Sequence, residues 1–211
     1  MNTGKRIAKM LLEIQAVALR DTQNLFTWAS GIQSPIYCDN RLTMAYPQVR
    51  EAIAEGFAAL IREKYPEAEV LVGTATAGIP HAAWTAQKLD LPMAYVRSNA
   101  KVHGRGNQIE GKVQQGQKVV VIEDLLSTGG SSLKAVKALQ EAGADVLGVV
   151  AIFSYGFDQL DQLFSSEGVV YHTLTSYQIL LPLAKEIGLL EEKEISLLEQ
   201  WSKNPYIFTE K

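Results

Sequence analysis

The chain has 211 residues, of which 47% are hydrophobic and 20% charged, so it can bury a sizeable core within a single domain. Its formal net charge is -3, so the chain as a whole is not attracted to the negative charge of nucleic acid, and a protein that binds nucleic acid through its overall charge is excluded. Cys38 is the single cysteine, which excludes an internal disulfide framework and favours a reducing compartment such as the cytoplasm.

An amphipathic helix is predicted at the N-terminus, over residues 1–19. Its apolar residues recur at helical spacing and are Ile7, Met10, Leu11, Ile14, Val17 and Ala18. Glu13 and Gln15 interrupt them, so the segment has the pattern of neither an export signal nor a membrane span. We therefore expect no membrane partner.

Residues 26–41, FTWASGIQSPIYCDNR, predict a hairpin or hooked loop, because two short apolar stretches surround a Ser-Gly and a Ser-Pro pair. Residues 45–65 then predict a helix with Pro47 in its first turn. The apolar face of this helix consists of Val49, Ile53, Phe57, Leu60 and Ile61.

Strands and helices alternate through the rest of the chain. Predicted strands cover residues 69–74, 93–97, 118–126, 145–155 and 168–174, and predicted helices cover residues 77–89, 131–143 and most of the chain beyond the last strand. The strands are nearly all apolar, which is typical of a parallel sheet covered on both faces. Residues 98–117 lack a period and predict a long loop. Ligands of such sheets bind beyond the carboxyl ends of the strands, where residues 73–78, 97–111 and 123–131 should meet.

The stretch VVVIEDLLSTGGSS, residues 119–132, ends an apolar strand in two acids and a run of small residues. Small residues before a helix let backbone N–H groups approach a phosphate, although the stretch is neither a Walker loop nor GxGxxG. On spacing alone, a plain strand–turn–helix junction explains the run equally well. Glu123 and Asp124 favour a ligand, because carboxylates beside a phosphate suit the vicinal hydroxyls of a ribose 5-phosphate.

The same stretch resembles the PRPP (5-phosphoribosyl 1-diphosphate) signature of the type I phosphoribosyltransferases. Residues 97–111 resemble the mobile catalytic loop of the orotate phosphoribosyltransferases, and residues 26–41 resemble their N-terminal, orotate-side hood. The matching loop positions are Arg97, Lys101, His103, Gly104, Glu110 and Gly111. The matching hood positions are Phe26, Ser30, Gly31, Ser34, Pro35, Tyr37, Asp39 and Arg41. The PRPP signature is specific only to the superfamily, and the hood and loop narrow the resemblance to the orotate enzymes.

The resemblance covers nearly the whole chain and implies a type I phosphoribosyltransferase fold, a mostly parallel central sheet flanked by helices with an N-terminal hood. Residues 1–211 would form a single phosphoribosyltransferase domain, with the first helix and hood in residues 1–45 and the core and C-terminal helices in residues 46–211. The resemblance also implies a homodimer in which each catalytic loop serves the neighbouring subunit.

The implied reaction joins orotate to PRPP, releases pyrophosphate and gives orotidine 5′-phosphate for pyrimidine biosynthesis. The implied cofactor is Mg²⁺, held mainly by PRPP and pyrophosphate. The expected catalytic residues are Lys101, His103 and Asp124. The expected PRPP-binding residues are Thr76, Ala77, Gly78, Arg97, Lys101, His103, Glu123, Asp124, Leu125, Leu126, Ser127, Thr128, Gly129, Gly130 and Ser131. The expected orotate-binding residues are Ile36, Tyr37 and Ser127.

Charge supports a polyanionic ligand at the predicted loop. Residues 97–118 contain five Lys or Arg residues and one acid, a net +4 in a chain whose total is -3. A solvated charged loop is the alternative explanation. A purine-type phosphoribosyltransferase and a non-catalytic PRPP-binding regulator are the rival functions. The resemblance of residues 26–41 to an orotate-side hood argues against the purine-type enzyme. The presence of a cationic loop and the lack of a basic helix-turn-helix segment argue against the regulator.

Several cations that are common in the family are absent from this chain. The positions are Ala29, Ala77 and Ser98, where relatives often carry Lys, and Gly156, near which some carry Arg. The orotate carboxylate therefore needs another partner. Backbone N–H groups near Ile36 and Tyr37, or the side chain of Arg41, are the candidates.

Overall fold

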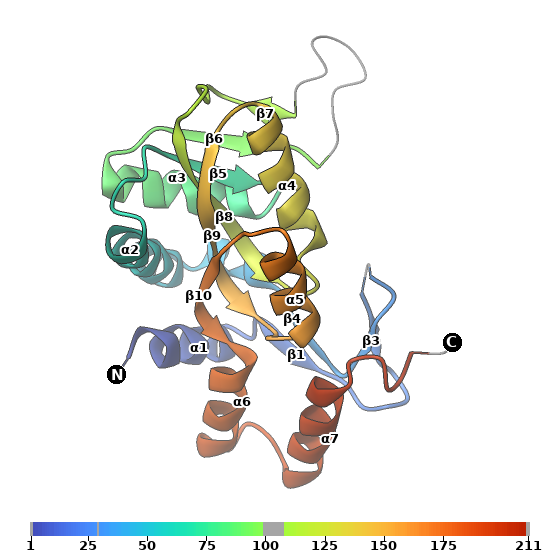
Figure 1. The fold of residues 1–211 in the computed structure, drawn as a ribbon. Helices are drawn as coiled ribbons and strands as arrows, with labels where there is room; N and C mark the ends of the chain where they lie inside the picture. The colour runs from blue at the N-terminus through green and yellow to red at the C-terminus, as the bar shows by residue number, and fades with distance from the viewer. Residues whose placement is uncertain (1, 29, 99–107, 210–211) are drawn as a thin grey trace.

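A six-stranded sheet forms the centre of the protein (Figure 1). The computed structural model describes residues 2–28, 30–98 and 108–209. The sheet order is β10-β9-β8-β5-β6-β7, and all neighbours are parallel except β6 and β7. The strands are β5 (Val70–Thr74), β6 (Met93–Val96), β7 (Ile109–Glu110), β8 (Lys118–Leu126), β9 (Asp145–Ser154) and β10 (Tyr171–Ser176). The predicted mostly parallel α/β fold is confirmed.

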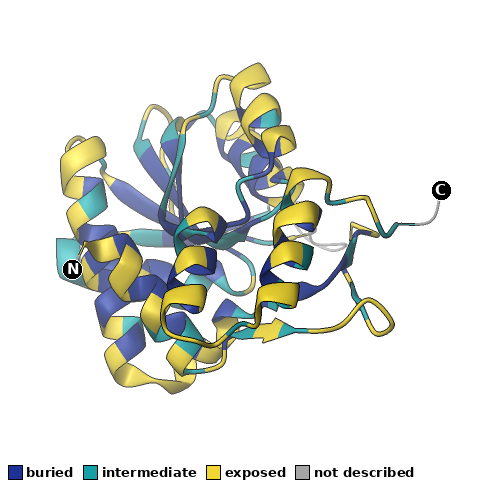
Figure 2. Ribbon diagram, turned by 90° about the horizontal axis from the view of Figure 1, so that it is seen from below, coloured by how far each residue is buried: buried dark blue, intermediate teal, exposed yellow. Residues whose placement is uncertain are grey.

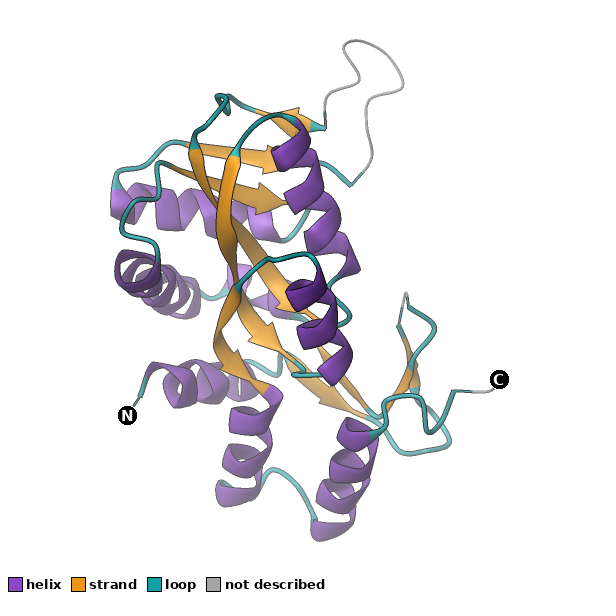
Figure 3. Ribbon diagram, viewed as in Figure 1, coloured by secondary structure: helices purple, strands orange, loops and turns teal. Residues whose placement is uncertain are grey.

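Helices cover both faces of this sheet (Figure 3). The α-helices of the described chain are α1 (Thr3–Glu13), α2 (Pro47–Lys64), α3 (Gly78–Leu89), α4 (Gly130–Glu141), α5 (Asp158–Ser166), α6 (Tyr177–Glu186) and α7 (Glu192–Lys203), of which α7 lies beside the hood. Successive strand residues point to opposite faces, so Val120 and Ile122 pack with α1, α2 and α3, whereas Val119 and Val121 pack with α4 and α5. Figure 2 shows the buried strands enclosed by helices whose outer sides are exposed. This double burial explains why the strand sequences are almost continuously apolar.

The N-terminal helix is shorter than predicted. It ends at Glu13, and Gln15 adopts a positive φ of 56°, which turns the chain. Val17 and Ala18 therefore belong to β1 (Val17–Leu19), which pairs antiparallel with β4 (Ile36–Cys38). The predicted hairpin is confirmed as β2 (Phe26–Thr27) paired with β3 (Gln33–Ser34). The short apolar run at Val17 and Ala18 fits the spacing of a helix as well as that of a strand. Its pairing with β4 makes it a strand in the folded protein.

Three other predictions differ from the structure. The segment expected to be a loop contains β7, an antiparallel edge strand on β6. Helix α5 lies between β9 and β10, although no helix was predicted there. Leu160 and Phe164, spaced one turn apart and buried, were its signal. The last strand begins at Tyr171, three residues later than expected, since Gly168 has a positive φ of 65° and turns the chain. In the described part of the chain, no helix is long and apolar enough to cross a membrane.

A short 3₁₀ helix, η1 (Asn40–Ala45), joins the hood to α2 and covers a buried histidine on α3. His81 Nε2 lies 3.3 Å from Thr43 Oγ1, and the ring packs edge-on against Trp84. Burial lowers the pKa of His81 from the ordinary 6.5 to about 4. The folded protein therefore keeps this imidazole neutral at pH values where the unfolded chain protonates it.

We expect this histidine to make stability depend on pH. The folded-state pKa is depressed, so the unfolded state binds the extra proton between pH 6.5 and about 4, and stability falls as the pH drops through this window. The free energy of unfolding should fall by about 2 kcal/mol between pH 7 and pH 5. Urea unfolding at several pH values measures it. The decline should shrink strongly in His81→Gln and less in the comparison variant His172→Gln, because partial burial lowers the pKa of His172 in the same direction. Equal slopes in wild type and His81→Gln would contradict the assignment.

Candidate active site

A pocket of about 910 Å³ opens where the parallel strands end. From β5 the chain continues to β6 on one side, whereas β8, β9 and β10 lie on the other side, so the connections diverge between β5 and β8. Such a switch point leaves a crevice beyond the carboxyl ends of the two strands. Residues 74–77, 97–98 and 123–125 line the pocket, with parts of residues 127–131. The predicted meeting of three segments is confirmed for the residues that the structure describes.

The junction of β8 and α4 is a loop of small residues at one end of the pocket. Gly129 has a φ of +81°, and a Cβ there would stand 2.6 Å from the side chains of Leu160 and Phe164, so the turn requires glycine. Apart from Gly130 itself, its chain neighbours and the backbone of its own helix, no described atom lies within 4 Å of where a Cβ on Gly130 would stand, which leaves this stretch of backbone open. Helix α4 begins here without a side-chain cap among the described residues, so its first N–H groups can receive an anion.

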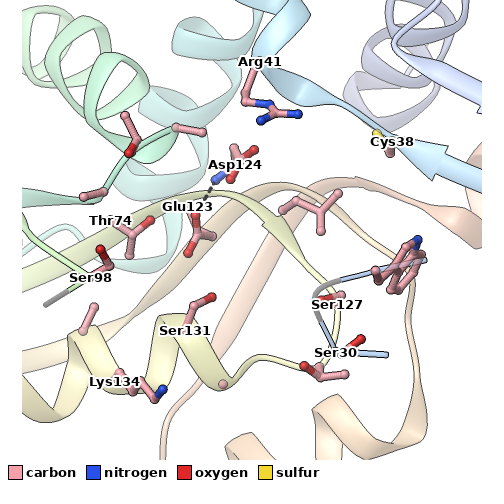
Figure 4. A pocket seen from close by; sticks show the side chains of 18 of the residues that line it. Ser30, Cys38, Arg41, Thr74, Ser98, Glu123, Asp124, Ser127, Ser131 and Lys134 are labelled. Carbon is pink, nitrogen blue, oxygen red and sulfur yellow. Dashed lines mark hydrogen bonds between the residues drawn. The ribbon is translucent and has the colours of Figure 1, made fainter. Parts of the chain in front are cut away.

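Two carboxylates lie next to each other on the pocket wall (Figure 4). The buried carboxylate of Glu123 accepts hydrogen bonds from Ser132 Oγ at 2.9 Å and from the backbone N–H of Asp124 at 3.1 Å. Burial, and then the negative charge of Glu123, raise the pKa of the Asp124 carboxyl well above its usual range, while Arg41 partly opposes this. The pair therefore favours a ligand that donates hydrogen bonds to carboxylates, as vicinal hydroxyls do.

An aromatic cluster holds the hood, residues 26–41, against the core. Trp28 packs on Tyr155 with ring centroids 4.5 Å apart, and both rings meet Trp201 of α7 edge-on. The backbone N–H of Cys38 donates to the Tyr155 hydroxyl at 2.9 Å, and Trp201 Nε1 donates to the carbonyl of Gln33 at 3.1 Å. Segments far apart in the sequence thus place β4 at the pocket, which Trp28, Cys38 and Tyr155 line.

Two arginines at the pocket have defined partners. Arg41 donates to Asp39 from Nε at 2.6 Å and from a terminal nitrogen at 2.9 Å, and this pairing lowers the pKa of the Asp39 carboxyl. The backbone N–H of Arg97 donates to the carbonyl of Gln108 at 2.9 Å, and its guanidinium lies 3.7 Å from Glu110. The two ends of the predicted catalytic loop are therefore held side by side at the pocket.

Most of the predicted ligand-binding residues line this pocket. They are Tyr37, Thr76, Ala77, Arg97, Glu123, Asp124, Leu125, Ser127, Thr128, Gly130 and Ser131. Gly78 and Gly129 are not among its lining residues. Ile36 and Leu126 bury their side chains in the core instead. The backbone N–H of Ile36, a candidate for a carboxylate, already donates to Ser34 Oγ at 3.1 Å. The predictions for Ala29, Lys101 and His103 lie outside the described residues.

Further pocket residues were not singled out from the sequence. They are Thr27, Val96, Gln108, Lys134, Ala135 and Tyr155. Lys134 had a readable signal, since it stands three residues after Ser131 on the same face of α4 and adds a cation to the pocket. Tyr155 also had a signal, since it ends the predicted strand 145–155 and the carboxyl ends of parallel strands border the crevice, and in the structure it packs against Trp28 of the hood.

Comparisons with known proteins agree with this geometry. A family model described as a phosphoribosyl transferase domain matches residues 45–175. An orotate phosphoribosyltransferase from Fusobacterium nucleatum is 58% identical over 95% of this chain and 96% of its own length. One from Listeria innocua is 55% identical over 99% of both chains. The crystal structure of orotate phosphoribosyltransferase from Aeropyrum pernix superposes with a TM-score of 0.75 at 26% identity, covering 88% of this chain and 99% of that one.

The raised pKa of Asp124 can be tested without a ligand. Glu123→Gln removes the neighbouring negative charge, so the pKa of the Asp124 carboxyl should fall. Arg41→Gln removes an attraction that favours the charged form, so the same pKa should rise. Carbon-13 NMR titration of the aspartate carboxyl groups measures both changes. An Asp124 titration that is the same in wild type and Glu123→Gln would contradict the coupling between the two acids.

Proposed function

This chain belongs to the orotate phosphoribosyltransferases of the type I phosphoribosyltransferase family, and from that membership we propose that it transfers the 5-phosphoribosyl group of PRPP to orotate. The products are orotidine 5′-phosphate and pyrophosphate, a step of de novo pyrimidine biosynthesis. One observation carries the proposal: a loop suited to phosphate, a pair of carboxylates and the hood border the same pocket.

The ribose 5-phosphate half of PRPP fits the end of β8. Residues 127–131 offer backbone N–H groups and hydroxyls to the 5′-phosphate at the N-terminus of α4. Glu123 and Asp124 accept hydrogen bonds from the two ribose hydroxyls. This arrangement turns C1′ of the ribose toward the hood, where the base would bind.

The diphosphate half of PRPP fits the neighbouring strand ends. Thr76 and Ala77 lie at the start of α3, whose N-terminal dipole favours negative charge. Arg97 lines the same side and supplies a cation. We assign Lys101 and His103 of the catalytic loop to the leaving diphosphate, with Lys101 as the principal cation and His103 as a second donor.

The chemistry is a displacement at C1′. Orotate N1, once it has lost its proton, forms a bond to C1′ while the bond from C1′ to the diphosphate oxygen breaks. The bonding electrons leave with the diphosphate, so positive charge develops on the ribose ring and negative charge on the leaving group. The protein contributes orientation of the two substrates and neutralisation of this charge. Exclusion of water from the pocket during the reaction would protect PRPP from hydrolysis.

We place orotate between the hood and the ribose, against Tyr37 and Ser127, which both line the pocket. Arg41 is the proposed partner of the orotate carboxylate. Its bonds to Asp39 use two of the five guanidinium N–H groups, so donors remain for a second carboxylate. This assignment supplies the positive charge that Ala77 and Ser98 do not.

Mg²⁺ is the proposed cofactor. The described residues contain no group of three or more His, Cys, Asp or Glu side chains that could hold a metal ion, whereas Glu123 and Asp124 offer oxygen atoms at the pocket. This donor set fits a hard cation that takes most of its ligands from phosphate, ribose and water. When bound, Mg²⁺ supplies positive charge that neutralises the leaving diphosphate.

We further propose a homodimer located in the cytoplasm. Leu42, Met44 and Tyr46 are exposed large apolar residues next to the pocket residue Arg41, and such residues suit a contact between subunits. A loop that reaches across such a contact would serve the partner's pocket. The single thiol of Cys38 is unpaired and buried, which fits a reducing compartment.

The proposed reaction should be directly measurable. We expect orotate absorbance to fall when protein, PRPP and Mg²⁺ are combined, and to stay constant when Mg²⁺ is chelated. Uracil, adenine and hypoxanthine should give no product, because none of them carries the carboxylate that Arg41 would bind. Turnover of a purine with none of orotate would overturn the assignment. PRPP binding without any turnover would favour a regulator instead.

Mixed dimers test whether the loop acts across subunits. Asp124→Asn should lower kcat/KM for PRPP by about tenfold to a hundredfold, because a charged hydrogen bond is lost, and Lys101→Ala should be similarly impaired. When the two variants exchange subunits, about half of the dimers are mixed, and each mixed dimer has one site with both residues intact. Activity should then recover to about one quarter of wild type. No recovery after demonstrated exchange would sink the shared-loop proposal.

A further inference from the structure

A buried asparagine outside the predicted ligand-binding set touches the backbone of Asp124. Asn40 is the first residue of η1, directly after the hood residue Asp39, and it is 1% exposed. Its side-chain Nδ2 donates a hydrogen bond of 2.6 Å to the carbonyl oxygen of Asp124. The contact spans 84 positions in the sequence and joins the hood segment to the end of β8.

The end of β8 needs this contact because β5 stops before it. The two strands pair up to Gly73 and Ile122, and Thr74 Oγ1 donates to the carbonyl of Ile122 at 3.3 Å. Carbonyl directions alternate along a strand, so Asp124, two residues later, turns its carbonyl to the same side. No β5 residue pairs with it there. The amide of Asn40 therefore takes the place of the missing strand partner.

Several buried groups fix the orientation of this amide. The thiol of Cys38 donates to Asn40 Oδ1 at 3.3 Å, and burial raises the pKa of that thiol, so it keeps its proton. With Oδ1 engaged by a donor, Nδ2 must face the carbonyl of Asp124. Thr43 Oγ1 donates to the carbonyl of Asn40 at 2.5 Å. Because that hydroxyl has only one proton, it accepts from His81, whose Nε2 lies 3.3 Å away and carries the hydrogen.

We infer that Asn40 is a positioning residue for the transfer reaction, and that Asn40, Thr43 and His81 form a buried relay that sets Asp124 relative to the hood. The relay rests on α3 at one end and on β8 at the other. It acts through the backbone of Asp124, whose carboxylate faces the pocket. Neither Asn40 nor Thr43 nor His81 lines the pocket itself.

The relay has a consequence for how the two substrates bind. Cys38, Asp39 and Arg41 line the pocket on the hood side, whereas Asp124 lines it on the ribose side. Asn40 is part of the hood segment, and its side chain is hydrogen-bonded to the backbone of Asp124. The hydrogen bond therefore ties the hood segment to the residue whose carboxylate is proposed to hold the ribose of PRPP. This inference rests on the proposed function and adds a coupling between its two half-sites.

The test compares four variants with the wild type. Asn40→Ala removes the donor and leaves a buried carbonyl unpaired, so kcat/KM for PRPP should fall about tenfold. Thr43→Val removes the hydroxyl at nearly constant volume and should cost about threefold. Thr43→Ser keeps the hydroxyl and should restore the wild-type value. Thr85→Val is the matched control, because Thr85 is buried one turn beyond His81 and its hydroxyl has no partner among the described residues.

PRPP affinity and the melting temperatures of the variants distinguish a loss of Asp124 positioning from a general loosening of the core. Calorimetry should give the same loss of PRPP affinity in Asn40→Ala as the kinetics, while Thr43→Val and Thr85→Val melt at similar temperatures. Wild-type kinetics in Thr43→Val, or an equal loss in Thr85→Val, would overturn the relay. Equal PRPP affinity in wild type and folded Asn40→Ala would do the same. A wild type that binds PRPP but turns over no orotate would instead contradict the proposed function, and the calorimetric comparison would still decide the relay.

Discussion

Two neighbouring carboxylates at the end of a buried strand are the constraint that the surrounding structure must satisfy. Burying an ionised carboxylate costs several kcal/mol unless hydrogen bonds or an opposite charge compensate. Glu123 obtains two donors, from Ser132 of α4 and from the backbone of the next residue. Asp124 has the charge of Arg41 nearby and remains partly uncompensated, which is why its pKa rises. A site with an unmet demand for donors is prepared for a ligand rich in hydroxyls.

The partners of this pair come from elements that the sheet alone does not position. Arg41 and Asn40 stand where the hood continues into η1, and that segment is held by contacts with distant parts of the chain. Trp201 of α7 and Tyr155 at the end of β9 pack against the hood and bond to its backbone. The C-terminal helix therefore supports a pocket to which it contributes no lining residue of its own. The shape of this pocket therefore depends on packing between segments that lie far apart in the sequence.

Local patterns were sufficient wherever one strong preference acted alone. The strand Lys118–Leu126 was predicted with its observed bounds, because it is apolar, bounded by turn residues and buried on both faces. The loop after it was recognised as a candidate phosphate site from its small residues. Predictions failed where the same residues fitted both helical and strand spacing, as at Val17, which was predicted in a helix and lies in β1. They also failed where a partner strand decided the outcome, as at Ile109, which is a strand residue only because β6 accepts it.

The sequence by itself determined the chemistry of the pocket in the described residues: the two acids, the small residues before α4 and the cation Arg97, together with the order of strands and helices that brings them to one edge. These features are local, since they follow from residue type and spacing. The tertiary structure alone decided which groups complete the site. Asn40 contacts Asp124 because β5 ends before β8 does, and the hood becomes a wall of the pocket because it packs against Tyr155 and Trp201. Contacts of this kind depend on three-dimensional packing between distant segments, and residue spacing carries no record of it.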